Sequence, residues 1–551
     1  MDQHLISWIV FLPMLAGLVL LFVPRELVKW VALFGSGLAF VLSLLLFKTF
    51  WGGDAAGVFG EAYGALHHVE RASWITGNKF NIEYFVGLDG LSFPLFLLTT
   101  FVSLLACLAS FNFDSWKINK GIKAYFFLFL LLETGMLGVF VSLDFFLFYV
   151  FWEVMLLPMY FLIGVWGGER REYAAIKFFI FTLAGSVLML VGLVAMFFYS
   201  ADAVAKYPEM ATSYHTGAPI ATGTFDLIEL STNDAIQKHF GDAGTKLLDM
   251  RFAPLMFMFL FIGFAIKLPC VPVHTWLPDA HVQAPTPISM ILAGVLLKMG
   301  GYGFLRLCYG IFPLGGEFWA SFLAVVAVVS ILYGALCAMA QTDFKKLVAY
   351  SSVSHMGYVL LGVCVMTTTG FQGAMFQMIA HGISSPMCFF LVGVIYDRAH
   401  HREINRFGGL WLSMPRYGSM ATLGFFASLG LPGLCGFVGE AYVLLGTFQA
   451  GPRFDWAYTA AICAAFGVVL TAGYILWVVQ RVYLGSVREE YKGFPEASGR
   501  EMLILAPLGA LCILLGVLPK QTVFDFMNGT LNLLIDQMNG VTQMAMAAAG
   551  G

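Results

Sequence analysis

Seven ionisable side chains interrupt long apolar stretches of this sequence. They are Glu133, Glu153, Lys267, Lys298, His355, His381 and Glu440. A charge near the centre of a lipid bilayer costs at least about 2.5 kcal/mol, so such residues are rare and usually functional. A proton cannot cross hydrocarbon unaided and needs a series of groups that each gain and lose a charge. Several such groups on separate apolar segments therefore indicate a path for protons or other ions.

The chemistry of four of these residues suggests a switch followed by a relay. Burial disfavours the charged form of Lys267, whereas a nearby Glu153 carboxylate favours it. At about 6 Å and an effective dielectric of about 20, the two charges attract each other by about 2.8 kcal/mol. Opening and closing this pair would make Lys267 release and hold a proton. Lys298 would then relay the proton at the centre, and Glu440 would receive it.

The same residues also have purely structural interpretations, which the sequence leaves open. Glu153 and Lys267 could form a static ion pair that clamps two helices. Glu440 could cap half of a broken helix, where a carboxylate favours the positive helix end. His355 and His381 could be hydrogen-bonded packing residues as readily as relays, and Arg306, near a helix end, could extend toward the membrane surface.

Composition predicts a membrane protein that crosses the bilayer many times. The chain has 551 residues, of which 59% are hydrophobic and 11% charged, whereas a soluble domain has about 25% charged residues. The net charge of −3 gives no indication of a nucleic-acid partner. The nine cysteines show no C-x-x-C spacing, and no G-x-G-x-x-G follows a strand, so we expect no metal, iron–sulfur or dinucleotide site in this chain.

Apolar runs close to the roughly 20 residues that span a bilayer predict an all-α bundle of fourteen helices. Their expected limits are 5–23, 29–49, 85–112, 123–143, 145–166, 173–199, 253–273, 286–309, 318–340, 344–366, 372–397, 417–446, 456–482 and 502–526. We interpret residues 1–528 as a single membrane domain followed by a polar tail, residues 529–551, whose conformation the sequence leaves open.

Two of these helices contain internal breaks. The seventh carries Pro269, Pro272 and Pro278, and the twelfth carries a Gly430–Pro432–Gly433 stretch. Proline kinks a helix, and broken backbone at membrane depth is tolerated where protein or water satisfies it. The breaks lie five helices apart, which predicts two five-helix repeats of inverted topology, as in many transporters. The repeats would span residues 123–309 and 318–482, between helices 1–3 (1–122) and a last helix (502–526).

The distribution of lysine and arginine predicts the orientation. Alternate short connections carry 17 of the 30 basic residues, and basic loops stay on the cytoplasmic side. Both termini and the stretches 51–80 and 200–252 are then expected outside. We interpret those two stretches as loops, the second with a short helix over 234–240.

Four motifs carry a resemblance to a known family. FWEVMLLPMYFLIGVWGG, FAIKLPCVPVHTWLPDAHVQAPTPISMILAGVLLKMGGYG, DFKKLVAYSSVSHMGY and LPGLCGFVGE resemble the antiporter-like subunits of respiratory complex I. That family also includes the large subunits of Mrp-type cation/proton antiporters and of membrane-bound hydrogenases. The resemblance covers residues 85–526.

Matched by motif, the resemblance implies roles for individual residues. The family's essential glutamate falls on Glu153, its broken-helix lysine on Lys267, its central lysine on Lys298 and its distal acid on Glu440, where two of the sister subunits typically carry lysine. His355 and His381 would continue the polar axis as possible relays. Glu133 varies among relatives, so a relay role for it stays open.

The resemblance also implies an activity and its surroundings. The chain would translocate protons as part of a bacterial inner-membrane NADH:quinone oxidoreductase, with sister antiporter-like subunits on both sides. FMN, iron–sulfur clusters and quinone would be held by partner subunits and none by this chain. The alternative is a subunit of an Mrp-type Na⁺/H⁺ antiporter or of a membrane-bound hydrogenase.

Overall fold

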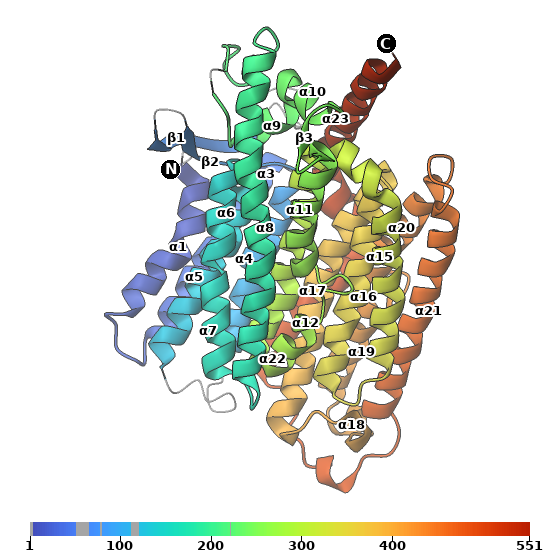
Figure 1. The fold of residues 1–551 in the computed structure, drawn as a ribbon. Helices are drawn as coiled ribbons and strands as arrows, with labels where there is room; N and C mark the ends of the chain where they lie inside the picture. Colours follow the sequence, from blue (N-terminus) through green and yellow to red (C-terminus); the bar gives the residue numbers. More distant parts are fainter. Residues whose placement is uncertain (1–3, 51–65, 78–79, 112–120, 221, 551) are drawn as a thin grey trace.

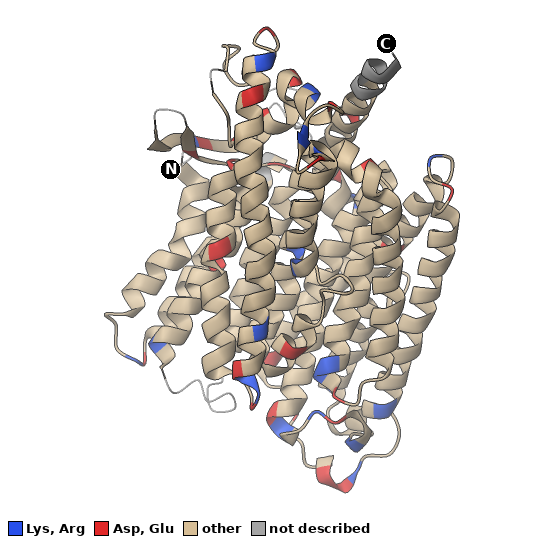
Figure 2. Ribbon diagram, viewed as in Figure 1, with Lys and Arg blue, Asp and Glu red and all other residues tan. Residues whose placement is uncertain are grey.

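The chain folds into one bundle of long helices that lie side by side (Figure 1). The structure is a computed structural model and describes residues 4–50, 66–77, 80–111, 121–220 and 222–550. The predicted loop 51–80 therefore lies partly outside the described residues. Apart from the buried candidate residues, the basic and acidic residues lie mostly at the two ends of the bundle (Figure 2).

The helices of the first half of the chain precede and surround the first break. They are α1 (Leu5–Leu20), α2 (Val28–Leu45), α3 (Phe47–Phe50), α4 (Ser92–Ala109), α5 (Ile122–Val141), α6 (Phe145–Val154), α7 (Leu156–Trp166), α8 (Arg171–Lys206), α9 (Leu227–Thr232), α10 (Asp234–Gly241), α11 (Phe252–Lys267) and α12 (Trp276–Gln283).

The second half begins with a helix that contains two π-helical segments. It runs through α13 (Thr286–Ile291), η2 (Leu292–Leu296), α14 (Leu297–Gly303) and η3 (Phe304–Tyr309). The helices that follow are α15 (Pro313–Met339), α16 (Phe344–Cys364), α17 (Thr368–Ala399), α18 (Leu410–Ser413), α19 (Pro415–Leu429), α20 (Cys435–Gln449), α21 (Ala457–Val482), α22 (Gly499–Val517) and α23 (Asp525–Gly550). Short helical turns cover Ile404–Arg406, Glu489–Tyr491 and Lys520–Phe524.

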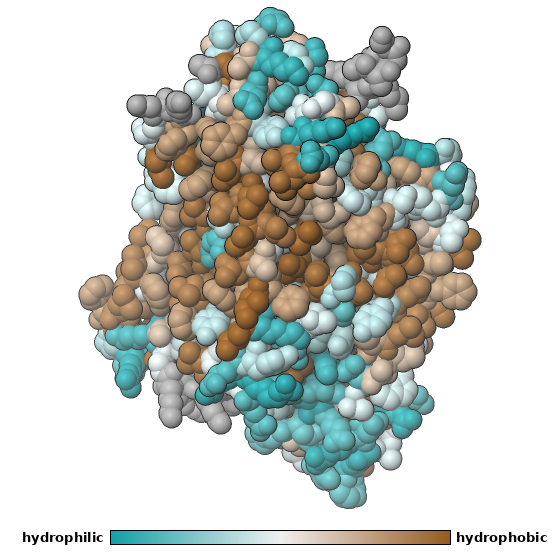
Figure 3. Space-filling model, in the orientation of Figure 1, coloured by the Kyte–Doolittle hydropathy of each residue, from teal (hydrophilic) through white to brown (hydrophobic). Residues whose placement is uncertain are grey.

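A belt of apolar side chains crosses the middle of the face of the bundle seen in Figure 3. In the described residues, 11 helices are long and apolar enough to cross a membrane. The apolar helices α1 and α11 are shorter, with 16 residues each. Phe34 and Phe466 are about two-thirds exposed on this belt, as expected for side chains that face lipid rather than water. The predicted membrane bundle is confirmed, while the count of fourteen and the inverted repeats stay predictions.

Both predicted helix breaks are present. α11 ends at Lys267, and the chain resumes helical conformation only at Trp276 in α12. α19 ends at Leu429, and the next residue, Gly430, has a φ of +83°, a left-handed conformation that glycine adopts without steric cost. α20 then begins at Cys435. The first break directly follows Lys267, and Glu440 lies in α20, the helix that follows the second break.

The structure departs from the predicted elements at one end of the bundle. Two antiparallel strands, β1 (His67–Thr76) and β2 (Asn81–Leu88), form a hairpin where a loop and the start of a helix were expected. The helix expected from residue 85 therefore begins only at Ser92. The predicted short helix over 234–240 is confirmed as α10. A second short hairpin pairs β3 (Lys246–Leu247) with β4 (Met250–Arg251).

The tail that the sequence left open forms α23, which packs through Met527, Leu531, Leu534 and Met538. We call the end of the bundle that carries β1–β2, α9, α10 and α23 the terminal face (top of Figure 1). The opposite end, which carries α18 and the connections around residues 168–171, 400–409 and 484–498, is called the basic face (bottom of Figure 1).

Candidate functional site

Lys298 lies at one end of a line of buried polar side chains. It is fully buried, in α14 between the two π-helical segments. Its Nζ donates to the carbonyl oxygen of Ala293, within η2, and lies 2.6 Å from Nδ1 of His381 in α17. Short π-helical segments disturb the regular i→i−4 bonding of a helix and occur often at functional sites. Here the side chain of Lys298 uses a carbonyl of such a segment.

Two glycines allow the helices of Lys298 and His381 to approach closely. A Cβ atom on Gly294 would lie 2.8 Å from Cγ of Pro386 and 3.4 Å from the carbonyl oxygen of Gly382. A Cβ atom on Gly382 would in turn lie 3.1 Å from the carbonyl oxygen of Gly294. Any larger residue at these positions would separate the helices. The short contact between Lys298 and His381 therefore depends on this packing.

The contacts continue from His381 to the second break. The rings of His381 and His355 lie 5.5 Å apart, centre to centre. Nδ1 of His355, in α16, lies 3.1 Å from Oε1 of Glu440 in α20 and 3.4 Å from Nε2 of Gln377. A protonated Nδ1 can donate to Glu440, and an unprotonated one can accept from Gln377. His355 thus has a partner in either protonation state.

Glu440 lies against the broken backbone of α19–α20. A Cβ atom on Gly430 would lie 2.9 Å from Oε2 of Glu440, so only glycine leaves room for the carboxylate there. The side chain of Glu440 is buried, with 4% of its surface exposed. His355 and His381, which the sequence supported least as relays, therefore lie between Lys298 and Glu440. The four residues come from four helices, α14, α17, α16 and α20.

Glu153 and Lys267 lie near each other but are not in contact. In the described residues, no carboxylate lies within 4.0 Å of Nζ of Lys267. That atom is 3.7 Å from Sδ of Met155 and 4.7 Å from the centre of the Trp152 ring, the neighbours of Glu153 in the chain. Oε1 of Glu153 is buried without a hydrogen-bond partner among the described residues. The structure therefore shows no ion pair between Glu153 and Lys267, and their coupling stays a prediction.

Glu133 lies apart from this line of residues. Its Oε2 accepts a hydrogen bond of 2.6 Å from Ser36 Oγ of α2, and its Oε1 has no partner among the described residues. No hydrogen bond between described protein groups joins Glu133 or Lys267 to Lys298. The structure thus brings Lys298, His381, His355 and Glu440 together and leaves Glu153, Lys267 and Glu133 outside that set.

Two further buried groups, His281 and Lys345, lie near the basic face. The ring of His281 stacks on Phe389 at 4.3 Å, and neither ring nitrogen has a hydrogen-bond partner among the described residues. Lys345 is 1% exposed and donates to the carbonyl oxygen of Ala284, at the end of α12. A cavity of about 770 Å³ opens on the basic face. Its lining includes Val282 and Asp343, which are close in the chain to His281 and Lys345, but not those two side chains themselves.

Arg306 does not extend toward the membrane surface, so that interpretation of the sequence is wrong. Its guanidinium group forms an ion pair with Asp89, and their side chains are only 3% and 0% exposed. Its Nε donates to the hydroxyl of Tyr302, at 3.2 Å. An arginine at the end of an apolar helix is ambiguous in a sequence, because its partner here is 217 positions away in the chain.

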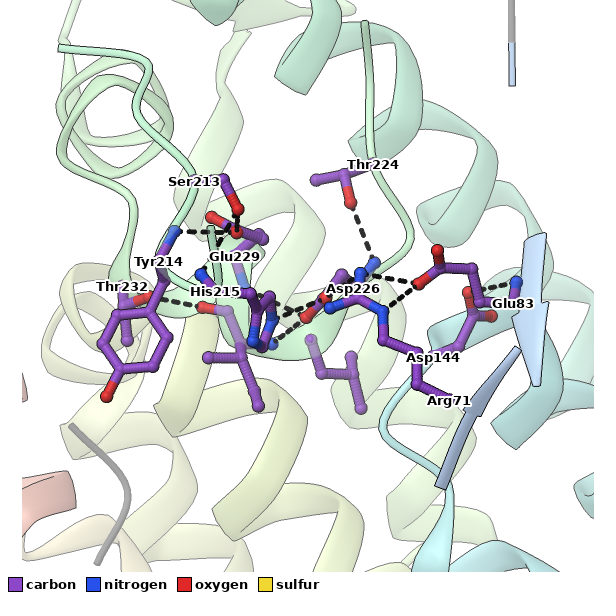
Figure 4. A network of polar contacts seen from close by, with 12 residues as sticks. Arg71, Glu83, Asp144, Ser213, Tyr214, His215, Thr224, Asp226, Glu229 and Thr232 are labelled. Carbon is purple, nitrogen blue, oxygen red and sulfur yellow. Dashed lines mark hydrogen bonds and ion pairs between the residues drawn. The ribbon is translucent and has the colours of Figure 1, made fainter. Parts of the chain in front are cut away.

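The terminal face carries a second polar network, centred on Asp226 (Figure 4). Oδ2 of Asp226 lies 2.9 Å from His215 Nε2 and 3.1 Å from the guanidinium of Arg71, which also binds Glu83 at 2.6 Å. Asp144 caps α6 through the backbone N–H of Leu147 and accepts from the N–H of Glu83.

This network ties the β1–β2 hairpin and the 213–229 segment to the start of α6. Residues 144 and 226 form a β-bridge, with the N–H of Phe145 donating to Phe225 and that of Leu227 to Leu143. Because Glu153 lies on α6, the network fixes the position of the helix that carries it.

Comparisons with known proteins agree with this arrangement. The family described as "NADH:quinone oxidoreductase/Mrp antiporter, TM" matches residues 142–467, and "NADH-ubiquinone oxidoreductase chain 4, amino terminus" matches residues 72–139. NADH-quinone oxidoreductase subunit M of Rhodobacter capsulatus is 42% identical over 557 positions, which cover 100% of each chain.

Solved structures show the same fold. A chain of respiratory complex I from Thermus thermophilus is 29% identical, with a TM-score of 0.77 over 97% of this chain and 99% of that one. A chain of the Mrp complex from Dietzia sp. DQ12-45-1b is 20% identical, with a TM-score of 0.74 over 98% and 99% of the two chains. At that identity the second likeness concerns the fold alone.

Proposed function

We propose that this chain, which belongs to the NADH:quinone oxidoreductase and Mrp antiporter transmembrane family, is an antiporter-like, proton-translocating membrane subunit of a respiratory NADH:quinone oxidoreductase. It corresponds to subunit M of that complex, the name of its full-length relatives. One observation carries the proposal: the buried contacts from Lys298 through His381 and His355 to Glu440 join four groups that can each carry a proton.

The Mrp alternative is less well supported. The likeness to the Mrp chain is at 20% identity, whereas the full-length similarity to subunit M reaches 42%. In our proposal the partners are the other subunits of the oxidoreductase, including sister antiporter-like chains. Those subunits hold the flavin, iron–sulfur clusters and quinone, and their redox reaction supplies the energy.

The proposed proton path begins at the basic face, which we assign to the cytoplasm, with both termini outside a bacterial inner membrane. Uptake occurs at the cavity on the basic face. At the centre, the proton lies either on Lys298, which then donates to Nδ1 of His381, or on His381, which then donates to neutral Lys298. It passes to His355 when the two rings approach, and from Nδ1 of His355 to the carboxylate of Glu440.

Glu153 and Lys267 control this transfer in our proposal. When the pair closes, the carboxylate stabilises the proton on Lys267, and when it opens, burial drives that proton off. Charge on Lys267 disfavours a second charge on Lys298, so the two lysines do not hold protons independently. The soft contacts of Lys267 with Met155 and Trp152 permit this movement, because neither contact competes strongly with a carboxylate.

The test is proton uptake per NADH oxidised in vesicles, normalised to the amount of assembled complex. Glu153→Ala and Lys298→Ala should each slow proton transfer through this chain by on the order of tenfold or more, in line with the loss of a positioned proton-transfer group. The ratio should then fall by the share of protons that this chain contributes. Glu153→Asp keeps the charge and should retain part of the activity. Lys177→Gln is the control, since Lys177 pairs with Asp279 outside the path. Normal pumping by Glu153→Ala would make that residue a structural clamp.

A further inference from the structure

Lys298, Tyr302 and Arg306 share one face of their helix, because they follow one another at spacings of four residues. All three are buried, with at most 4% exposure. The helix runs from the basic side toward the terminal face, so this ladder of side chains leads from the central lysine directly toward that face. A proton that followed it would bypass His381, His355 and Glu440.

The groups at the far end of the ladder do not relay protons. The hydroxyl of Tyr302 donates to the carbonyl oxygen of Phe140, at 3.2 Å, and a carbonyl cannot pass a proton on. The guanidinium of Arg306 stays protonated in proteins. The carboxylate of Asp89 is occupied by Arg306 and by three further donors, the N–H groups of Leu91 and Ser92 and the hydroxyl of Ser92, at 2.9–3.0 Å.

The terminal side of this ion pair is closed by α23. The N–H of Gly90 donates to Oγ1 of Thr530 at 3.0 Å. A Cβ atom on Gly90 would collide with the carbonyl oxygen of Phe526, so a glycine is needed for this approach. The turn that carries Asp89 is thus held between Arg306 and α23, with no room for either charge to move away from the other.

Stability alone does not explain such a pair. Desolvating two charges offsets most of their attraction, and apolar replacements of similar volume are often neutral or stabilising. A hydrogen-bonded ion pair that offers no group to relay a proton has a different use beside a proton path. We propose that Arg306 and Asp89 form a proton-tight seal that closes the direct route from Lys298 to the terminal face, so that the proton leaves Lys298 only through His381.

This inference rests on the proposed function of Lys298, and it is tested by passive leak rather than by pumping. Vesicles containing the assembled complex are given a pH gradient without NADH, and its decay is followed with a pH-sensitive dye. Arg306→Met leaves the Asp89 carboxyl buried without its counter-charge and therefore able to take up a proton. We expect the gradient to decay several-fold faster, protons pumped per NADH to fall, and NADH oxidation to continue.

Three further variants identify the route of the proton leak and its cause. Arg306→Lys keeps the positive charge and should remain close to the wild-type decay rate. The double variant Asp89→Asn, Arg306→Gln keeps hydrogen bonding but has no titratable group, so it should also remain tight. Arg306→Met combined with Lys298→Ala should abolish the leak, because the route starts at Lys298.

A wild-type decay rate in Arg306→Met, or a leak that persists without Lys298, overturns the seal. If Arg306→Met fails to assemble, the double variant still tests the proposal. A leak in the double variant would contradict a seal that depends on the absence of a group able to relay protons. The outcome is separable from the proposed function: the seal can fail while Lys298→Ala alone still abolishes pumping.

Discussion

At Lys298 the position of a proton is decided between two nitrogens 2.6 Å apart. An ammonium group only donates, so His381 must then accept at Nδ1, whereas a neutral amine can accept from a protonated Nδ1. The contact therefore suits both states of the transfer. The other polar partner of Lys298, the carbonyl oxygen of Ala293, stabilises the charged lysine and holds its side chain in place.

His381→Gln tests this point at the level of one side chain. The amide oxygen can still accept from Lys298, but glutamine cannot carry a proton at neutral pH. We expect proton transfer through this chain to slow by on the order of tenfold or more and protons pumped per NADH to fall by this chain's share, with assembly retained. His239→Gln, in α10 of the terminal face, is the matched control and should pump normally. Equal pumping by both variants would make His381 a packing residue.

Some of these residue roles could be predicted from the sequence and others could not. Buried charge in an apolar stretch is visible in composition, which is why Glu153, Lys267, Lys298 and Glu440 were candidates. The contacts that join the site residues were not visible in the sequence. Lys298 and His381 are 83 positions apart, and His355 and Glu440 are 85 positions apart. The Lys298–Tyr302–Arg306 spacing was a readable signal for the ladder, but its partner Asp89 was not.

At the scale of the element, the break between α19 and α20 positions Glu440. Gly430 and Gly433 both have positive φ, +83° and +90°. A Cβ atom on Gly430 would meet the side chain of Glu440, whereas nothing lies within 4 Å of a Cβ atom on Gly433. The break was predictable from Pro432 and its flanking glycines, whereas the contact between Gly430 and the carboxylate required the folded backbone.

This pair of glycines gives a matched experiment. Gly430→Ala and Gly433→Ala should each cost about 1–2 kcal/mol of local backbone strain. Only Gly430→Ala should displace the Glu440 carboxylate from His355 and lower protons pumped per assembled complex. Thermal stability and vesicle pumping measure the two effects separately. Equal losses of pumping in the two variants would assign the defect to helix strain rather than to the position of Glu440.

At the scale of the whole molecule, the terminal-face network joins the hairpin, the 213–229 segment and α6. Glu229 of this network accepts from the hydroxyl of Ser213 and the N–H of Tyr214. Burial is the main cause that raises the pKa of Glu229 above its ordinary value. The hairpin was not predicted, because its first strand is amphipathic and polar and follows a Gly-rich stretch that is typical of loops.

The raised pKa gives this network a pH dependence of known sign. In the pH range just above 4.5, the folded segment holds the Glu229 proton and the unfolded segment does not. Stability is therefore greatest at low pH and is lost as pH rises through the folded-state pKa. Hydrogen exchange of residues 213–230, corrected for its intrinsic pH dependence, should show protection falling with pH. Glu229→Gln should remove that trend, and a trend of opposite sign would contradict the assignment.

The two faces of the bundle also predict the orientation of the chain in its membrane. The connections on the basic face carry Arg402, Arg406 and Arg488, and Arg416 and Arg481 lie in the adjoining ends of α19 and α21. Basic residues at such positions remain on the cytoplasmic side. Thr216 on the terminal face and Ser486 on the basic face are both exposed. In a cysteine-free background, Thr216→Cys should react with a membrane-impermeant maleimide from outside intact cells, and Ser486→Cys only in inverted vesicles. Labelling of both positions from one side would overturn the orientation and, with it, the cytoplasmic assignment of the cavity on the basic face.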